Sequence, residues 1–281
     1  MSLVIRPVKR LGQNFLRDPN TARRIVAALD VPETEPVVEV GPGTGALTGI
    51  LAARFGQFAA LEVDDRAVAH LRETLPGVDV RQADVLEADW KALADEMGRP
   101  LHVISNLPYY ITSEILFGLV DARAHIGQAV VMMQKEVARR IVAVPRTKEY
   151  GILSVVLQRV CLPKLLFDVS PNVFYPKPEV TSSVLRLDFR AGPHDDVDPA
   201  WFRTVVRTAF NQRRKTLRNS LSRLEREVPE HWRECRAEEL TPADFVEMTR
   251  YLAGASHPHP SHGTDPQARR GDGPHEVGGG S

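Results

Sequence analysis

Cysteine is scarce in this chain, with only Cys161 and Cys235 among 281 residues. Two cysteines cannot build the disulfide framework of a small secreted domain, and no Cys-x-x-Cys pair suggests a metal site. No apolar run approaches the roughly 20 residues that span a bilayer. The first residues also lack the apolar segment of a secretory signal. We therefore expect a cytoplasmic protein with no metal and no membrane contact.

An excess of charge of either sign is absent too, because 36 basic residues balance 36 acidic ones. The balance hides an uneven distribution. Residues 1–24 hold 6 basic residues and 1 acid, and residues 201–226 hold 8 basic residues and 1 acid. These two stretches carry a net charge of +12 against −12 for the remainder. The zero total therefore does not exclude nucleic acid as a partner.

Short runs rich in Val and Ile alternate with segments whose apolar residues recur at helical spacing. The expected strands are residues 37–40, 58–63, 78–81, 102–105, 129–134, 152–162 and 183–189. Such alternation indicates βαβ units, because parallel neighbours need a crossover connection. No clear helix lies between the last two runs (residues 163–181), which favours an antiparallel edge. We predict an α/β fold with a doubly wound, mostly parallel, seven-stranded methyltransferase (Rossmann-like) sheet.

The pattern changes after residue 190, which divides the chain into three predicted parts. Residues 1–190 form the methyltransferase domain. A linker rich in Gly, Pro and Asp follows, and helical patterns at residues 201–227 and 242–252 predict a small helical domain over residues 191–253. Residues 254–281 contain 7 Gly, 4 Pro and 4 His, and Val277 is their only branched aliphatic residue. Such a segment cannot bury enough apolar surface to fold, so a disordered tail is expected.

A glycine-rich segment, EVGPGTG at residues 39–45, follows the first expected strand. Glycines such as Gly41 and Gly43 allow a sharp turn and the close approach of a ligand. Glu62 lies 21 positions after Gly41, where a carboxylate can accept hydrogen bonds from ribose hydroxyls. Asp84 follows the third strand at the same edge and could accept from an adenine amine. The GxGxG spacing favours S-adenosylmethionine over a dinucleotide, whose fingerprint is GxGxxG.

The sequence SNLPYY at residues 105–110 follows the fourth strand and is the most specific motif. An adenine amine is a poor nucleophile because its lone pair is delocalised into the ring. The Asn106 side-chain oxygen and the Leu107 carbonyl could accept its two N–H bonds and localise that pair. Pro108 stiffens the turn, and Tyr109 offers a flat face to an extruded base. A plain Asn-x-Pro turn explains Pro108, but not Asn106 and Tyr109 together.

These motifs are similar to those of a known family, the small-subunit (16S) ribosomal RNA adenine N6,N6-dimethyltransferases of the KsgA type. The resemblance runs from about residue 10 to residue 252. The shared motifs are GQNFL at 12–16, EVGPGTG at 39–45, NLPY at 106–109, QKEVA at 134–138, YGILS at 150–154, FYPKPEV at 174–180 and residues 210–221.

The resemblance implies a role for each matching residue. Asn14 and Leu16 would close over S-adenosylmethionine, Gly41 and Gly43 would lie beside it, Glu62 would hold its ribose and Asp84 its adenine. Asn106 would engage both the methyl group and the target amine, with Leu107 and Pro108 completing the catalytic turn. Tyr109 and Phe174 would sandwich the target adenine, although a core position explains Phe174 equally well from the sequence alone.

The resemblance also implies the substrate and the partner. It implies dimethylation of N6 of two adjacent adenosines in the 3′-terminal hairpin loop of 16S rRNA, within the immature small ribosomal subunit. Lys and Arg with almost no acid nearby suit RNA phosphates, so Arg213, Arg214, Lys215 and Arg218 are predicted to bind RNA. We expect a monomer.

Three other functions remain open from the sequence. One is the related large-subunit rRNA methyltransferase linked to macrolide resistance. Another is a DNA adenine methyltransferase, although those enzymes usually carry Pro where Leu107 stands. The third belongs to a different class, a binding protein that acts as an assembly checkpoint on the immature small subunit. An intact Asn106–Tyr109 motif argues against a purely non-catalytic role.

Overall fold

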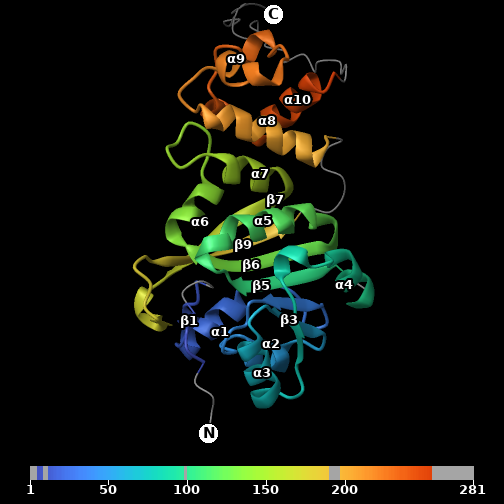
Figure 1. The fold of residues 1–281 in the computed structure, drawn as a ribbon, viewed down its shortest axis with the longest axis vertical. Helices are drawn as coiled ribbons and strands as arrows, with labels where there is room; N and C mark the ends of the chain where they lie inside the picture. Colours follow the sequence, from blue (N-terminus) through green and yellow to red (C-terminus); the bar gives the residue numbers. More distant parts are fainter. Residues whose placement is uncertain (1–4, 9–11, 98–99, 190–196, 255–281) are drawn as a thin grey trace, which may run out of the picture.

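The structure, a computed structural model, describes residues 5–8, 12–97, 100–189 and 197–254. A seven-stranded sheet with strand order β4-β3-β2-β5-β6-β9-β7 lies at its centre (Figure 1). Its strands are β2 (Val37–Val40), β3 (Phe58–Glu62), β4 (Asp79–Gln82), β5 (Leu101–Asn106), β6 (Ile126–Gln134), β7 (Cys161–Val169) and β9 (Ser182–Phe189). Neighbours from β4 through β6 are parallel, whereas β9 pairs antiparallel with β6 and with β7. The predicted seven-stranded, mostly parallel sheet with an antiparallel edge is confirmed.

Helices cover both faces of this sheet because its central strands are apolar on both sides. In β5, Val103 faces one cluster of buried side chains and Ile104 the other. Helices α1 (Pro19–Ala27) and α2 (Thr48–Arg54) pack on the Ile104 side, and α3 (Asp65–Thr74) covers the outer strands β3 and β4. The Val103 side carries α4 (Trp90–Met97), α5 (Thr112–Asp121), α6 (Lys135–Val142) and α7 (Ile152–Val160). This is the doubly wound arrangement.

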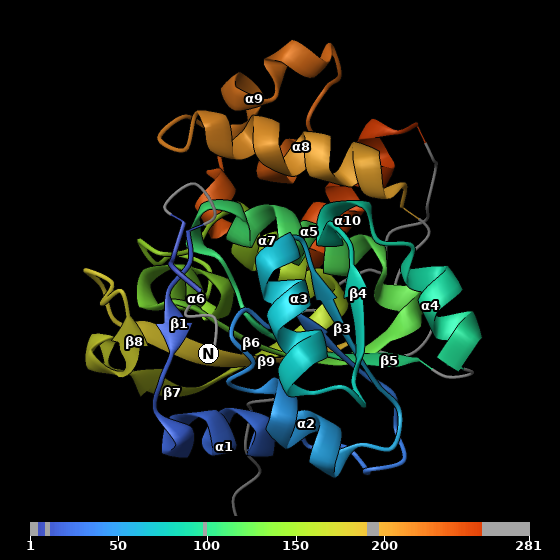
Figure 2. The same ribbon diagram turned by 60° about the horizontal axis from the view of Figure 1, so that its bottom comes forward.

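The C-terminal helices stack beyond α7, on the side of the sheet opposite α1 and α2 (Figures 1 and 2). They are α8 (Pro199–Asn211), α9 (Leu217–Ser220) and α10 (Pro242–Leu252). Phe202 of α8 and Phe245 of α10 are fully buried in the same apolar cluster as Leu157 of α7. The helical region therefore shares a continuous core with the sheet. Residues 191–196 of the predicted linker (191–199) and residues 255–281 of the predicted tail (254–281) lie outside the described residues.

One predicted strand is wrong. Residues 152–162 were expected to form a strand, but Ile152–Val160 is helix α7 and strand β7 begins at Cys161. Helix α7 lies between the sheet and the C-terminal helices, so most of its residues are buried, as in a strand of a parallel sheet. Strand β7 instead occupies the first part of the expected loop. It lies at the sheet edge, where Pro163 removes no central hydrogen bond.

The single long helix expected over residues 201–227 is also wrong, whereas the helix at 242–252 is confirmed. Helix α8 ends at Asn211, and α9 and a 3-10 turn at Ser222–Leu224 follow separately. The chain leaves the helix because other segments bind it there. The Leu217 amide donates to the Cys235 carbonyl at 2.7 Å, and Thr216 forms an antiparallel bridge with Arg236.

A second, two-stranded sheet joins distant parts of the chain beside the main sheet. Strand β1 (Phe15–Leu16) pairs antiparallel with β8 (Phe174–Tyr175), with Leu16 opposite Phe174. This pairing brings the N-terminal GQNFL motif next to the segment that contains Phe174.

Candidate active site

A cavity of about 370 Å³ lies at the carboxyl ends of the parallel strands. This volume is within the range of small-molecule sites, roughly 300–1,000 Å³. Ligands of open α/β sheets bind at this edge because the loops after the strands meet there. All the predicted cofactor residues line the cavity, as do Asn106, Leu107, Pro108 and Tyr109.

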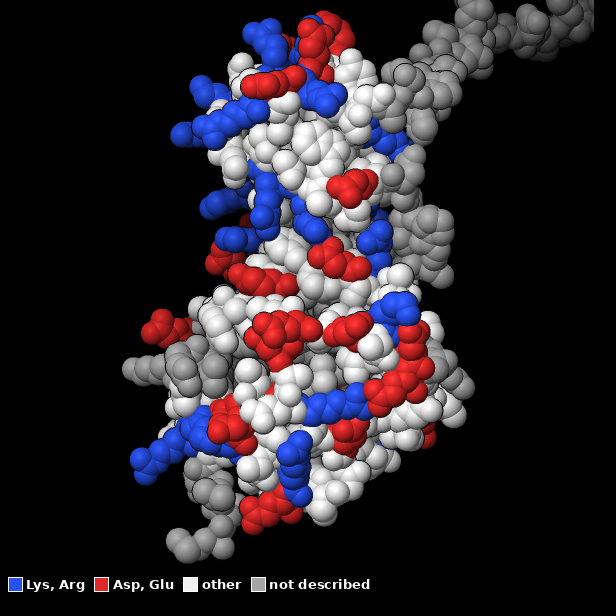
Figure 3. Space-filling model, turned by 45° about the vertical axis from the view of Figure 1, so that its right-hand side comes forward, with Lys and Arg blue, Asp and Glu red and all other residues white. Residues whose placement is uncertain are grey.

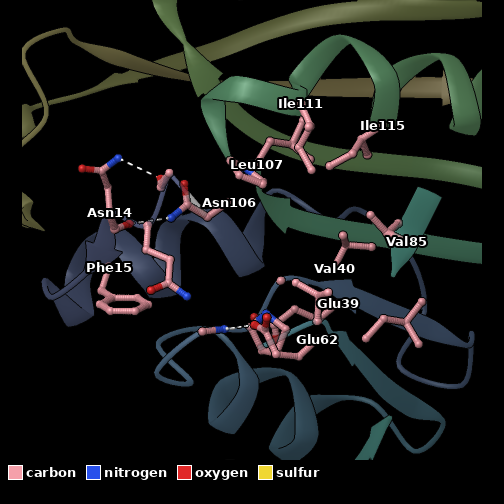
Figure 4. A pocket seen from close by; sticks show the side chains of 18 of the residues that line it. Asn14, Phe15, Glu39, Val40, Glu62, Val85, Asn106, Leu107, Ile111 and Ile115 are labelled. Carbon is pink, nitrogen blue, oxygen red and sulfur yellow. Dashed lines mark hydrogen bonds between the residues drawn. The ribbon is translucent and has the colours of Figure 1, made fainter. Parts of the chain in front are cut away.

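The glycine-rich turn and Glu62 form one wall of the cavity (Figure 4). Gly41 and Gly43 have φ of +65° and +56°, a conformation that L side chains adopt only with strain. The Glu62 carboxylate accepts hydrogen bonds from the Gly43 amide and the Asp64 amide, both at 2.9 Å. Burial raises the pKa of Glu62, and those two backbone N–H groups oppose the rise. The turn therefore holds Glu62 in place with its carboxylate at the cavity.

Glu39 is a second buried carboxyl group in this wall, and the sequence assigned it no role. It lies in β2 with 2% of its surface exposed, and one of its oxygens, Oε2, has no hydrogen-bond partner among the described residues. Burial raises its pKa to about 8, and the nearby Glu62 carboxylate adds to the rise. Its signal in the sequence was a lone acid inside the apolar run VVEV.

The Asn106 side chain is oriented by the N-terminal segment. Its Nδ2 donates to the main-chain carbonyl of Asn14 at 3.1 Å (Figure 4). An amide carries its donor nitrogen and its acceptor oxygen on opposite sides. With Nδ2 bound to Asn14, Oδ1 is the atom that remains to accept a hydrogen bond.

The turn after Asn106 supplies a second acceptor. The Leu107 amide donates to the Met132 carbonyl at 2.9 Å, which fixes the turn to β6. The Pro108 carbonyl accepts from the Thr112 hydroxyl at 3.0 Å. The Leu107 carbonyl accepts no hydrogen bond from any described residue. Tyr109 stands beside it, half-buried, and its hydroxyl lies 2.7 Å from that of Ser182.

The N-terminal segment forms a further wall and is fastened at several points. Gln13 donates from Nε2 to Asp64 Oδ2 at 2.8 Å, and Asp64 also binds the Arg66 guanidinium. This guanidinium holds the pKa of Asp64 at about 2. The ring of Phe15 lies over Gly43, where a Cβ would come within 2.9 Å of it. The sequence did not predict the contacts of Gln13 and Phe15, because they depend on residues far along the chain.

Asp84 and Phe174 differ from the other predicted residues. Asp84 is exposed at the cavity rim and caps a 3-10 turn by accepting from the Leu86 amide at 2.9 Å. Phe174 does not line the cavity. It is 5% exposed and packs in the core cluster with Leu16, its partner in the small sheet. Its stacking on a base therefore stays a prediction.

The four predicted RNA contacts separate into two kinds. Arg214, Lys215 and Arg218 are exposed on and after the turn between α8 and α9. Arg213 instead points inward, binding Glu238 at 2.6 Å and the carbonyls of Lys148 and Thr147 at 2.7 and 2.8 Å. Figure 3 shows Lys and Arg side chains gathered over the part of the molecule formed by the C-terminal helices. Acidic side chains concentrate nearer the sheet in the same view.

This fold and this site together define a class: methyltransferases that take a nucleoside-type cofactor and modify an amino nitrogen. The glycine turn with Glu62 and the Asn-Leu-Pro-Tyr turn line the same cavity at the carboxyl ends of the strands. No helix among the described residues has both the length and the apolar character to cross a membrane.

Comparison with known proteins gives the family. Residues 6–253 match the family described as Ribosomal RNA adenine dimethylase. Ribosomal RNA small subunit methyltransferase A of Salinibacter ruber is 54% identical over 267 residues, which cover 92% of this chain and 90% of that protein. The protein of the same name from Ligilactobacillus salivarius is 42% identical over 264 residues, covering 87% of this chain and 89% of that protein.

Two solved structures have the same fold. A dimethyladenosine transferase from Plasmodium falciparum matches with a TM-score of 0.73 at 22% identity, covering 86% of this chain and 98% of that one. The 23S rRNA methyltransferase ErmE matches with a TM-score of 0.65 at 28% identity, covering 85% of this chain and 100% of that one. This chain belongs to the ribosomal RNA adenine dimethylase family. The prediction of an enzyme that methylates adenine in ribosomal RNA is confirmed.

Proposed function

We propose that this protein transfers methyl groups from S-adenosylmethionine to N6 of two adjacent adenosines in the 3′-terminal hairpin loop of 16S rRNA. It dimethylates each base and acts in the cytoplasm, as a monomer, on the immature small ribosomal subunit. The relatives that share 54% and 42% identity with it are both named for the small subunit. The observation that carries the chemistry is the bond from Asn106 to the Asn14 carbonyl, because it leaves an acceptor oxygen for the target amine.

The residues of the cavity fit S-adenosylmethionine. The backbone at Gly41 faces open space, since a Cβ there would meet no atom within 4 Å. Glu62 and Asp84 add carboxylates to the lining, which suits a cofactor with a sulfonium and an ammonium group. The unpartnered Glu39 oxygen is a ready acceptor in a buried place. When bound, the cofactor supplies an electrophilic methyl group.

The chain's own groups then position the acceptor. Asn106 Oδ1 and the Leu107 carbonyl accept the two N–H bonds of the adenine amine, which localises its lone pair toward the cavity. Tyr109 stacks on the base and excludes water from one face. The methylated nitrogen loses its proton readily, so no strong base is required, and positioning provides most of the rate enhancement.

Binding of RNA is assigned to the helical region of residues 197–254, with Arg214, Lys215 and Arg218 at phosphates. All three are exposed, Arg214 and Lys215 on the turn before α9 and Arg218 in α9 itself. Their positive charges favour a phosphate backbone and make binding dependent on salt. Arg213 supports this surface from inside rather than touching RNA, because its guanidinium is held by Glu238 and two carbonyls.

Methyl transfer to three substrates offered in parallel tests the proposed function. Labelled S-adenosylmethionine is added with unmethylated small subunits, with large-subunit rRNA or with duplex DNA, and the labelled base is mapped. Label on two adjacent adenosines of the small subunit is the expected result. Label on large-subunit RNA or on DNA contradicts the proposal, and binding without any transfer indicates a checkpoint protein.

The Asn106→Ala variant tests the mechanism. Transfer should fall by on the order of 10²-fold or more, as when a positioned hydrogen-bonding group is removed from an active site. Cofactor affinity should change little. Asn20→Ala, an exposed position on α1, serves as the control and should keep its activity. Turnover by Asn106→Ala at the wild-type rate would refute the role of the amide.

A further inference from the structure

The Tyr109 hydroxyl is anchored to the sheet by a single serine. Its oxygen lies 2.7 Å from Oγ of Ser182, the first residue of β9. Ser182 is fully buried and is paired on both sides, with Gln134 of β6 and with Val169 of β7. A hydroxyl in the middle of three paired strands moves little, so it is a rigid anchor.

Tyr109 itself sits on a much less constrained element. It begins a 3-10 turn of three residues, Tyr109–Ile111, and its side chain is half-buried at the cavity. A ring on such a turn can tilt about its side-chain bonds unless its far end is held. Burial raises the pKa of the Tyr109 hydroxyl, so this group remains a neutral hydrogen-bonding partner at physiological pH.

The adjacent serine shows that this contact is particular to Ser182. Ser183 is equally buried, but its hydroxyl donates to Asp168 Oδ1 at 2.7 Å, on the other side of the strand. Successive side chains of a strand point to opposite faces, so only one of the two serines can reach Tyr109. Ser183 therefore provides a matched control for the loss of a buried hydroxyl from the same strand.

We propose that Ser182 is a positioning residue for the methyl transfer: it fixes the tilt of the Tyr109 ring and thereby the place of the target adenine beside Asn106. This inference rests on the proposed function, since Tyr109 must stack on the base for its tilt to matter. Removal of the hydroxyl should lower the rate of transfer more than the affinity for RNA, because phosphate contacts elsewhere provide most of that affinity.

A double-mutant cycle tests the coupling. Ser182→Ala, Tyr109→Phe and the double variant are compared with Ser183→Ala, using unmethylated small subunits as substrate. Each single variant should lower kcat on the order of tenfold, as expected when one hydrogen bond is lost, with KM for the subunit unchanged. The double variant should lose no more than either single variant, because both remove the same bond. Ser183→Ala should keep the wild-type kcat.

Two further measurements separate positioning from general damage. Cofactor affinity by calorimetry should be the same in all variants. A hairpin RNA with 2-aminopurine at the target adenosine should show weaker fluorescence quenching with Ser182→Ala than with the wild type, because the base stacks less well on a tilting ring. If Ser182→Ala lowers stability, Tyr109→Phe still removes the bond from the more exposed side.

Additive losses in the double variant, or equal effects of Ser182→Ala and Ser183→Ala, would overturn the positioning role while leaving the proposed function intact. Failure of the wild type to label small subunits would instead overturn the proposed function. The two failures are therefore distinguishable.

Discussion

Replacing Glu39 with Gln should remove a pH dependence of stability that this buried carboxyl imposes. Burial raises its pKa from an ordinary value of 4.5 to about 8. Between these values the unfolded chain has released the proton, whereas the folded chain still holds it. The free energy of unfolding therefore falls as the pH rises through this interval. A glutamine does not titrate, so it contributes no such slope.

The size of this pH dependence follows from the pKa shift of Glu39. One pKa unit corresponds to about 1.4 kcal/mol of difference between the two protonation states. On that scale, the wild type should lose roughly 3 kcal/mol of unfolding free energy between pH 5 and pH 8 through Glu39 alone. Titrating groups that do not interact with Glu39 act equally on both proteins and cancel in the difference. Relative to the wild type, the free energy of unfolding of the Glu39→Gln variant should rise by that amount between pH 5 and pH 8.

Urea unfolding of the cofactor-free protein at pH 5, 6, 7 and 8, followed by circular dichroism, measures this difference. Glu114→Gln is the matched control, because Glu114 is an exposed carboxyl on α5. Its unfolding free energy should track the wild type at every pH. If the Glu39→Gln and wild-type values stay parallel from pH 5 to pH 8, the account of a buried, protonated carboxyl is wrong.

The remaining predictions concern the glycine turn and the two neighbouring arginines. Gly41→Ala should cost about 1–2 kcal/mol of stability from its backbone conformation and should weaken cofactor binding measured by calorimetry, because the new Cβ enters the cavity. Gly43→Ala should cost about 1–3 kcal/mol more, since its Cβ would lie 2.9 Å from the Phe15 ring; equal unfolding curves for the two variants would contradict this. Arg213→Gln should lower the free energy of unfolding by about 1–2 kcal/mol with the salt dependence of RNA binding unchanged. Arg214→Gln should leave the free energy of unfolding unchanged and reduce the slope of log affinity against log salt by about 1. If Arg213→Gln changes the slope and Arg214→Gln changes the stability, the assignment of different roles to these two arginines is wrong.

The local sequence pattern was sufficient to predict the strands in the parallel half of the sheet. Its strands are short and, apart from the edge strand β4 (DVRQ), mostly apolar, and each is followed by a helix, as the alternating sequence pattern predicts. The pattern failed at Ile152–Val160 because a helix buried on nearly all sides has no polar face to show its period. Only the tertiary position of α7, between the sheet and the C-terminal helices, distinguishes it from a buried strand.

The wrong prediction of one long helix over residues 201–227 has a different cause. The run of basic residues from 201 to 226 has helical spacing, but the chain turns after Asn211 because other segments bind it. Arg213 reaches carbonyls at 147 and 148, and Leu217 donates to Cys235. These partners are from 18 to 66 positions away, beyond the window of any periodicity argument. The same contacts hold the guanidinium of Arg213, which the sequence alone does not distinguish from the other three predicted RNA contacts.

Most of the predicted site residues line the cavity, for a reason that also limits what the sequence can predict. Chemistry restricts the side chains that can hold a ribose or accept from an amine, so Glu62 and Asn106 stand out in a sequence. The orientation of Asn106, however, comes from the main-chain carbonyl of Asn14, 92 positions earlier. Every residue type carries such a carbonyl, so the contact leaves no trace in the choice of amino acid at that position. The backbone path that places the Asn14 carbonyl does leave a trace in the sequence. The trace is Gly12, which has φ of +57° and lies against Tyr110, where a Cβ would come within 2.8 Å of the ring. The N-terminal segment thus orients the Asn106 side chain through its path, and Gly12 is the residue by which the sequence specifies that path.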